Sequence, residues 1–137
     1  METASFVKPT EDQIAALSSF EDGTQPLVMI NLLRFREKAV YPEGASHAPC
    51  SGREAYQRYA AGVMPILAAV GAEVRYFAAV VQTVIGPEDE HWDETILVEY
   101  PSLDVFRTML SSPEYVEVMV HRQAALADSR LIMTRAI

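Results

Sequence analysis

The sequence predicts an α+β fold with one sheet, and three observations lead to it. The last third has the order strand, helix, helix, strand: TILVEY (95–100), LDVFRTMLSS (103–112), a helix opened by SPEY (112–115) and SRLIMTRAI (129–137). A strand–helix–strand unit precedes it, in which LVMINLLRF (27–35) and EVRYFAAVVQTVI (73–85) flank a long helical segment. Finally, 137 residues of which 50% are hydrophobic suit one domain with a core, so we expect a single domain over residues 1–137.

Capping boxes begin the first two predicted helices. Thr10–Gln13 has the Thr-x-x-Gln pattern, so a short helix is expected within an N-terminal helical extension of residues 1–25. Ser51–Glu54 has the Ser-x-x-Glu form and opens a long helix, which Gly71 is placed to end. The extension and the long helix therefore have defined starting points.

A long irregular segment separates the first strand from the long helix. Residues 36–50 include prolines and glycine and show no hydrophobic period. Loops of this length in a compact domain are often lids or binding loops. We therefore expect residues 36–50 to form a loop over the cleft.

The two strand pairs, each with a helical crossover or hairpin, predict a ferredoxin-like, four-stranded antiparallel sheet with helices on one face. The first strand is apolar on both sides, with Val28, Ile30 and Leu32 alternating with other hydrophobic residues. Helices on one face would leave an apolar face in water that is larger than soluble monomers tolerate. The sequence thus predicts a homodimer through the uncovered sheet face.

The overall charge argues against several classes of partner. The formal net charge is -8, which disfavours nucleic acid and anionic membrane surfaces. The single cysteine, Cys50, excludes an intramolecular disulfide and suits a reducing compartment, and no secretory signal or membrane span is evident, so we expect a cytoplasmic location. No pattern of metal ligands is complete, and we expect no metal site.

Three blocks carry a family resemblance: PLVMINLLRF, SGREAYQRYAAGVMPILAAVGAEV, and TILVEYPSLDVFRTMLSSPEYVEVMVHRQAAL. Together, over about residues 26–137, they resemble domain-of-unknown-function family 1330 of the dimeric α+β barrel superfamily. The resemblance implies a ferredoxin-like protomer and a dimer whose sheets form a barrel. The superfamily includes cofactor-independent monooxygenases, haem-degrading enzymes, lactone isomerases, dehalogenating enzymes and ligand-binding regulators, so the resemblance implies no single reaction.

The comparison with the haem degraders argues against haem. Those proteins resemble this chain over FRTMLSSPEYVEVMV but place a tryptophan and a histidine where this sequence has Met109 and Met119. His121 lies about 200° around the helix from Met119, so it does not replace that histidine as an iron ligand. We therefore expect no cofactor.

Three residues are candidates for a catalytic role. Asn31 is the one uncharged polar residue in an apolar strand, and its amide either bonds to a neighbouring strand or buried water or orients a ligand carbonyl. An asparagine on the first strand is also similar to one in the superfamily's monooxygenases and haem degraders. Tyr59 lies on the inner stripe of the long helix, as core or as a donor. Glu99 is either a general base or a salt-bridge partner on the barrel side, because a strand apolar on both faces does not reveal which way it points.

Four residues are candidates for substrate binding. Arg122 falls on the inward stripe of the last helix, where it either forms an ion pair, with Glu99 or a loop carboxylate, or binds an anion. Arg34 ends the first strand, as a surface residue or at the same rim. Tyr56 and Tyr76 are core residues or hydrogen-bond donors to a ligand.

The site residues favour a small-molecule cleft between sheet and helices. One hypothesis is a cofactor-independent isomerase or monooxygenase that acts on a carbonyl-containing or anionic metabolite. The alternative is a non-catalytic ligand-binding or stress-associated dimeric module.

Overall fold

The computed structural model describes residues 5–21 and 23–137. In chain order it contains α1 (Glu11–Ser18), β1 (Leu27–Phe35), α2 (Gly52–Val70), β2 (Glu73–Ala79), β3 (Glu94–Tyr100), α3 (Leu103–Leu110), α4 (Pro113–Ala125) and β4 (Leu126–Thr134). The strands form one antiparallel sheet in the order β2-β3-β1-β4. This arrangement confirms the predicted ferredoxin-like α+β fold.

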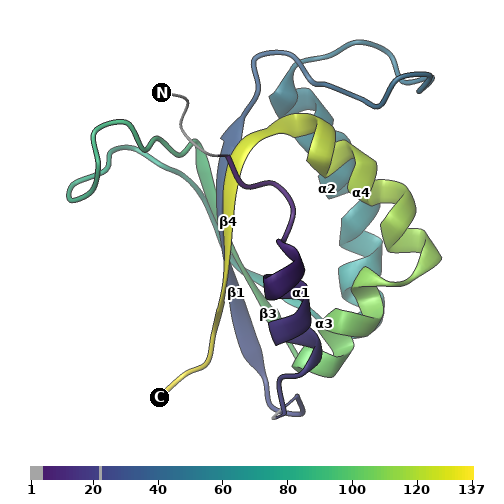
Figure 1. Ribbon diagram of the computed structural model, residues 1–137, viewed down its shortest axis with the longest axis vertical. Helices are drawn as coiled ribbons and strands as arrows, with labels where there is room; N and C mark the ends of the chain where they lie inside the picture. Colours follow the sequence, from purple (N-terminus) through teal and green to yellow (C-terminus); the bar gives the residue numbers. More distant parts are fainter. Residues whose placement is uncertain (1–4, 22) are drawn as a thin grey trace.

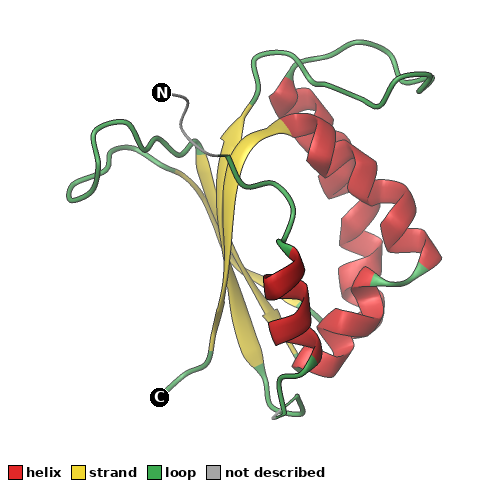
Figure 2. Cartoon of the chain, viewed as in Figure 1, coloured by secondary structure: helices red, strands yellow, loops and turns green. Residues whose placement is uncertain are grey.

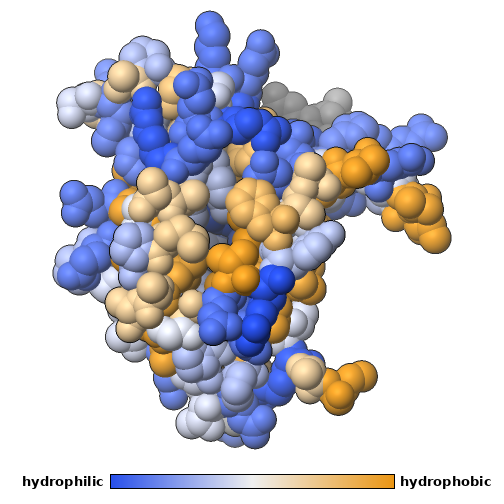
Figure 3. Space-filling view, turned by 180° about the vertical axis from the view of Figure 1, so that it is seen from behind, coloured by the Kyte–Doolittle hydropathy of each residue, from blue (hydrophilic) through white to orange (hydrophobic). Residues whose placement is uncertain are grey.

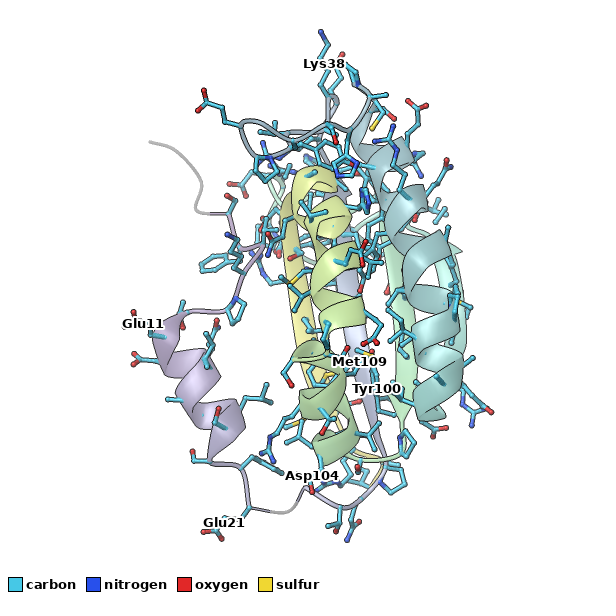
Figure 4. The ribbon with its side chains drawn as sticks, turned by 90° about the vertical axis from the view of Figure 1, so that its right-hand side faces the viewer. Glu11, Glu21, Lys38, Tyr100, Asp104 and Met109 are labelled. Carbon is cyan, nitrogen blue, oxygen red and sulfur yellow. The ribbon has the colours of Figure 1, made fainter. Side chains whose placement is uncertain are left out.

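The molecule has two main layers. Helices α2, α3 and α4 lie on one side of the sheet, whereas the other side has no helix over it (Figures 1 and 2). Helix α1 lies apart from them, beyond the β4 edge of the sheet (Figure 4). None of the described helices is long and apolar enough to cross a bilayer.

Side chains from the helix layer and one face of the sheet form the core. On β1, Leu27, Met29 and Leu33 point to the helices and are at most 3% exposed. Their register partners on β3 include Val98 and Tyr100, which are also buried. This alternation places the odd-numbered positions of β1 inside, as a half-covered strand requires.

The opposite side, here called the open face, is the side of the sheet away from α2–α4. It presents apolar side chains from all four strands: Val28, Ile30, Leu32, Tyr76, Leu97 and Ile132. Tyr76 is 57% exposed and Ile132 48% exposed. The apolar uncovered face expected from the alternation on the first strand is therefore present.

The helix starts agree with the sequence. Thr10 and Ser51 each accept a hydrogen bond from the N3 backbone and complete a capping box. Gly71 ends α2 with φ of +78°, a left-handed conformation that glycine adopts without a steric penalty.

The second strand is shorter than predicted. Strand β2 ends at Ala79, which pairs with Glu94, the first residue of β3. Beyond that pair there is no strand partner, so residues 80–93 leave the sheet as a projecting loop, here called the arm. β-type residues alone do not make a strand without a neighbour to accept their hydrogen bonds.

Helices α2 and α4 approach closely at one glycine. A Cβ added at Gly62 would lie 2.5 Å from Cγ1 of Val118. The missing side chain thus lets the two helices pack side by side over the sheet.

Candidate functional site

A cavity of about 700 Å³ lies between the sheet and the helices. Its walls are largely apolar and include methionines from five different elements: Met29, Met64, Met109, Met119 and Met133. Apolar walls with a few convergent polar groups are typical of small-molecule sites, and this volume suits a ligand of drug-like size. The polar groups decide what such a ligand can be.

Four tyrosines, here called the tyrosine cluster, line the cavity: Tyr56, Tyr59, Tyr100 and Tyr115. The hydroxyl oxygens of Tyr59 and Tyr115 are 3.1 Å apart and share one hydrogen bond. Because each hydroxyl carries one proton and the pair uses only one, the second proton is left to donate elsewhere.

The other two hydroxyls of the cluster face open space. Within the described part of the chain, Tyr56 and Tyr100 form no side-chain hydrogen bond, yet no fully buried side-chain nitrogen or oxygen lacks a partner there. Their hydroxyl groups must therefore be accessible from the cavity that both residues line. They are preformed hydrogen-bond donors.

Burial keeps these tyrosines protonated. It raises the pKa of Tyr56 to about 12 and the pKa of Tyr59 well above its usual value, although the positive charge of Arg122 opposes the shift. Burial raises the pKa of Tyr100 in the same way. At neutral pH these hydroxyls can therefore donate hydrogen bonds but do not act as bases.

Arg122 brings a positive charge into the cavity. Its Nη1 donates a long hydrogen bond of 3.4 Å to the carbonyl oxygen of Val7. Among the described residues it forms no ion pair: Glu99, one of the partners considered for it, pairs with Arg75 instead. A guanidinium inside a mostly apolar cavity without a counter-ion favours an anionic ligand group.

Asn31 is held by the sheet on one side. Its Nδ2 donates to the carbonyl oxygen of Ile96 at 3.1 Å, so the amide orientation is fixed by the neighbouring strand. Its side-chain oxygen accepts no hydrogen bond from a described residue, and the residue lines the cavity. Asn31 therefore offers an acceptor, and one remaining N–H, to a ligand.

The N-terminal segment closes one side of the cavity. Residues 6–17, here called the strap, contribute six lining residues: Phe6, Val7, Lys8, Pro9, Gln13 and Leu17. The carboxylate of Asp128 accepts from the Phe6 N–H at 2.8 Å, and Arg107 donates to the carbonyl oxygen of Leu17, so both ends of the strap are tied down. The guanidinium of Arg130 lies over the Phe6 ring, 5.1 Å from its centroid.

The loop of residues 36–50 does not line this cavity, so the expectation that it covers the cleft is corrected. Backbone hydrogen bonds hold it at the C-terminal end of α4: Arg36 N–H donates to the carbonyl oxygen of Ala125 and Val40 N–H to that of Ala124. The loop is therefore bound to the last turn of α4 and contributes no wall to the cavity.

Three of the candidate residues lie outside the cavity. Arg34 and Glu99 are at open-face positions of β1 and β3, and Tyr76 is at an open-face position of β2. Glu99 accepts from Arg75 at 2.5 Å, so it is a partner in a partly exposed ion pair. The structure thus brings Asn31, Tyr56, Tyr59 and Arg122 together and leaves the other three on the opposite side of the sheet.

A second polar cluster lies under the loop of residues 36–50. The Tyr41 hydroxyl is 2.7 Å from Nδ1 of His121 and accepts a hydrogen bond from Arg58. The His47 ring packs on both Tyr41 and His121, at 4.7 Å between centroids. Burial lowers the pKa of His121, and electrostatic repulsion from His47 and Arg58 lowers it further.

The described residues contain no group of three or more His, Cys, Asp or Glu that could hold a metal ion. The described residues lining the large cavity also include no carboxylate, histidine or cysteine. The site is therefore rich in hydrogen-bond donors, and two of its lining cations, Lys8 and Arg122, form no ion pair with a described residue.

Comparison with known proteins places the chain. The profile described as "Domain of unknown function (DUF1330)" matches residues 46–136. The chain belongs to the DUF1330 family. No protein of curated function gives a significant match.

One solved structure is similar to this DUF1330 protein over nearly its whole length. The RPA0582 protein of unknown function from Rhodopseudomonas palustris is 36% identical, and 98% of each chain is covered with a TM-score of 0.88. A dimeric protein of unknown function and ferredoxin-like fold from Bacteroides fragilis is 12% identical over 81% of this chain and 96% of its own, with a TM-score of 0.52. SnoaB, a cofactor-independent oxygenase from Streptomyces nogalater, is 13% identical over 82% and 94%, with a TM-score of 0.52. The last two show a shared fold.

The sequence of this DUF1330 chain did not reveal the strap or two members of the tyrosine cluster, Tyr100 and Tyr115. Tyr100 ends a strand as a buried residue, and its pattern gave no sign that its hydroxyl opens into a cavity. The strap lies outside the resembling blocks, and the capping box at Thr10–Gln13 predicts its helix but no contact with the cavity.

Proposed function

We propose that the protein binds a small carbonyl-containing or anionic metabolite in this cavity and stabilises its enolate form. The observation that carries the proposal is the unpaired Arg122 guanidinium beside the protonated tyrosine cluster. A cation and neutral donors fixed in a low-dielectric site stabilise an oxyanion far better than water does. The reaction class is cofactor-independent isomerisation or oxygenation.

The absence of a base among the described lining residues restricts the substrate. Glu99, on the open face, is too far removed in the fold to take a proton in the cavity, so it has no role in this proposal. A ligand whose acidic hydrogen lies between two carbonyls, or on a phenol with electron-withdrawing substituents, gives up that proton to water readily once Arg122 and a tyrosine hold its oxygen. Such ligands need an oxyanion site more than a base.

The fold is compatible with this chemistry. SnoaB of Streptomyces nogalater, which shares the fold, is a cofactor-independent oxygenase. A hydroxynitrile lyase from Passiflora edulis also shares it, at 11% identity and a TM-score of 0.53. These likenesses concern the fold, and the proposal for this chain stands on its own cavity.

Binding is tested by measuring the affinities of a panel of aromatic monocarboxylates and 1,3-dicarbonyl compounds by thermal shift and calorimetry. Arg122→Gln is expected to weaken anionic probes by about 10- to 100-fold, since a charge-assisted hydrogen bond contributes about 1.5–3 kcal/mol. Probes that stay neutral in the site should bind as before. Arg34→Gln removes the same charge on the open face and serves as the control; equal affinities in the wild type and Arg122→Gln would refute the anion site.

Turnover distinguishes the enzyme from the alternative. The alternative, a ligand-binding or stress-associated module, is favoured by the missing base, because ligands that do not ionise easily would then only bind. A bound probe is incubated with the protein and its recovery measured, together with oxygen consumption. Catalysis is supported if the wild type forms a product and Asn31→Ala does not, although the variant still binds the probe. Full recovery of unchanged probe from the wild type supports the ligand-binding module.

We also propose that two copies pair through the open face. Six apolar side chains from four strands lie there with no helix over them, which is more than soluble monomers commonly expose in one patch. The Bacteroides fragilis protein of the same fold is dimeric. Sedimentation at micromolar concentration tests this pairing, and Ile132→Glu, at a half-exposed position of the edge strand, is expected to abolish it.

A further inference from the structure

The arm of residues 80–93 carries three aliphatic side chains almost wholly in water. Val81, Val84 and Ile85 are 96%, 85% and 95% exposed. Single exposed hydrophobic residues are common, but three within five positions on one projection form a patch that marks an interaction surface. Sheet pairing ends at Ala79, so nothing in the described protomer uses these side chains.

We propose that the arm clasps a second copy of the chain, with its aliphatic side chains buried against the partner. The inference rests on the sheet-to-sheet pairing proposed above and adds a specific contact to it. The arm leaves the sheet on the side away from α2–α4, which is the side of the open face (Figures 1 and 2). Hydrophobic side chains gather at the far end of this projection (Figure 3).

The length of the arm suits this role. Its 14 residues give two limbs of about seven residues, which reach at most roughly 23 Å at about 3.3 Å per residue. Two sheets that pack face to face lie only about 10 Å apart. The end of the arm therefore extends past the partner's sheet surface and lies against its side.

The base of the arm is fixed, so the projection is held in place. Val80 N–H donates to the carbonyl oxygen of Asp93 at 2.9 Å, and Asp93 N–H donates to Leu33 at 2.7 Å. The Trp92 ring lies under the guanidinium of Arg130, 5.0 Å from its centroid. A preorganised base lowers the conformational entropy lost when the arm docks.

The open face alone gives a small interface. Four strands about 4.8 Å apart and about eight residues long cover roughly 500 Å² in plan. Side-chain relief raises the accessible area somewhat, which leaves the face near the lower end of stable interfaces, about 600 Å² per partner, and below the standard size of about 800 Å² per partner. Arms reaching across in both directions supply the additional apolar area.

The chemistry of the arm also selects among occupants. Glu88 and Asp89 follow the aliphatic patch and are exposed. Carboxylates beside the hydrophobic residues disfavour an anionic lipid surface, which would attract basic residues instead. A protein surface, here a second copy, is the better fit.

The test is the dimer dissociation constant of the full chain, measured by sedimentation and by the emission of Trp92, the single tryptophan, on dilution. The variant is Val84→Ser combined with Ile85→Ser, which removes apolar area without adding charge. Because both side chains are almost fully exposed, the protomer is expected to keep its fold, and circular dichroism checks this. Val116→Ser combined with Val40→Ser, at positions 51% and 59% exposed, is the matched control.

We expect the arm variant to raise the dissociation constant at least tenfold and the control to leave it unchanged. A wild-type dimer whose dissociation constant stays within twofold in the arm variant overturns the clasp, while sensitivity to Ile132→Glu still supports pairing through the sheet. A wild type that stays monomeric at all concentrations overturns both proposals.

Discussion

At the residue scale, the hydroxyl pair in the tyrosine cluster is the clearest case of a buried polar contact. Tyr59 and Tyr115 are both buried, and their oxygens lie 3.1 Å apart. A buried hydrogen bond between neutral groups adds about 1 kcal/mol to the free energy of unfolding, and an unpaired buried hydroxyl subtracts at least as much. The pair therefore stabilises the core as well as shaping the site.

Tyr59→Phe is expected to lower the free energy of unfolding by about 1 kcal/mol, measured by urea denaturation. Tyr100→Phe is the matched control. The Tyr100 hydroxyl has no hydrogen-bond partner among the described residues, so its removal should change the free energy of unfolding little. A double-mutant cycle with Tyr115→Phe should give a coupling of similar size. Equal losses for Tyr59→Phe and Tyr100→Phe would contradict the hydrogen bond.

His121 predicts a pH dependence of stability. Burial, then His47 and Arg58, lowers its pKa in the folded state below the usual value of 6.5. Between the two pKa values the unfolded chain binds more protons, so stability is full above about pH 6.5 and falls as the pH drops below it. We expect urea midpoints to decrease from pH 7.5 to 5.5.

The His121→Gln variant separates this effect from other titrations. Its midpoint should change less over the same range than that of the wild type. Asp128 and Glu54 also have lowered pKa values, but these carboxylates lose their contribution only near pH 4 and below. An unchanged slope in His121→Gln would show that another group is responsible.

At the element scale, the packing of α2 on α4 depends on one missing side chain. A Cβ at position 62 would lie 2.5 Å from Val118, well inside contact distance. Gly62→Ala gains about 1 kcal/mol of helix propensity but overpacks the contact by about 1–3 kcal/mol. A net loss of about 1 kcal/mol is expected in chemical denaturation.

The second-site variant identifies the cause of that loss. Val118→Ala removes the methyl groups that the new Cβ would meet, so Gly62→Ala combined with Val118→Ala should be more stable than the sum of the single effects. Strict additivity would mean that the close contact is not what makes glycine necessary.

The strap depends on the carboxylate of Asp128. Burial raises the pKa of this group, but hydrogen bonds from Phe6 N–H, Arg130 and Ser129 N–H outweigh burial and lower it overall. Asp128→Asn is therefore expected to reduce the free energy of unfolding by about 1–2 kcal/mol. Hydrogen exchange at the Phe6 amide should become faster, whereas Asp89→Asn, in the exposed part of the arm, should leave it unchanged.

At the scale of the whole molecule, pairing links stability to concentration. If two copies associate through the open face, a hundredfold rise in protein concentration adds about 2.7 kcal/mol to the stability of the associated state. The midpoint of thermal unfolding is then expected to rise as the protein concentration is raised from about 1 to about 100 µM, a range on the order of the dissociation constants of weak dimers. Ile132→Glu should make it independent of concentration.

The sequence predicted the sheet and its helices because their signals are local. Capping residues at Thr10 and Ser51, and the alternation along β1, each depend on a few neighbouring positions. The end of β2 was missed because it depends on where β3 begins, and that position is distant in the sequence. The side of the sheet on which Glu99 lies was left undecided for a different reason, because both sides of its strand carry apolar residues.

The cavity was predicted only in part. Arg122 and Tyr59 followed from helical periodicity, since both lie on inward stripes. The strap was assigned no role because its contact with the cavity depends on tertiary hydrogen bonds from Asp128 and Arg107. The loop of residues 36–50 was placed over the cleft because of its length and irregular composition, which do not reveal the residues that it contacts.

Arg130 joins two segments that are far apart in sequence. Its guanidinium lies between the rings of Phe6, in the strap, and Trp92, at the base of the arm, and it also bonds to Asp128. A change at this one position disturbs the wall of the cavity and the support of the arm together. Substitutions at position 130 will therefore not separate ligand binding in the cavity from the positioning of the arm. Selection for one of these two properties constrains the other.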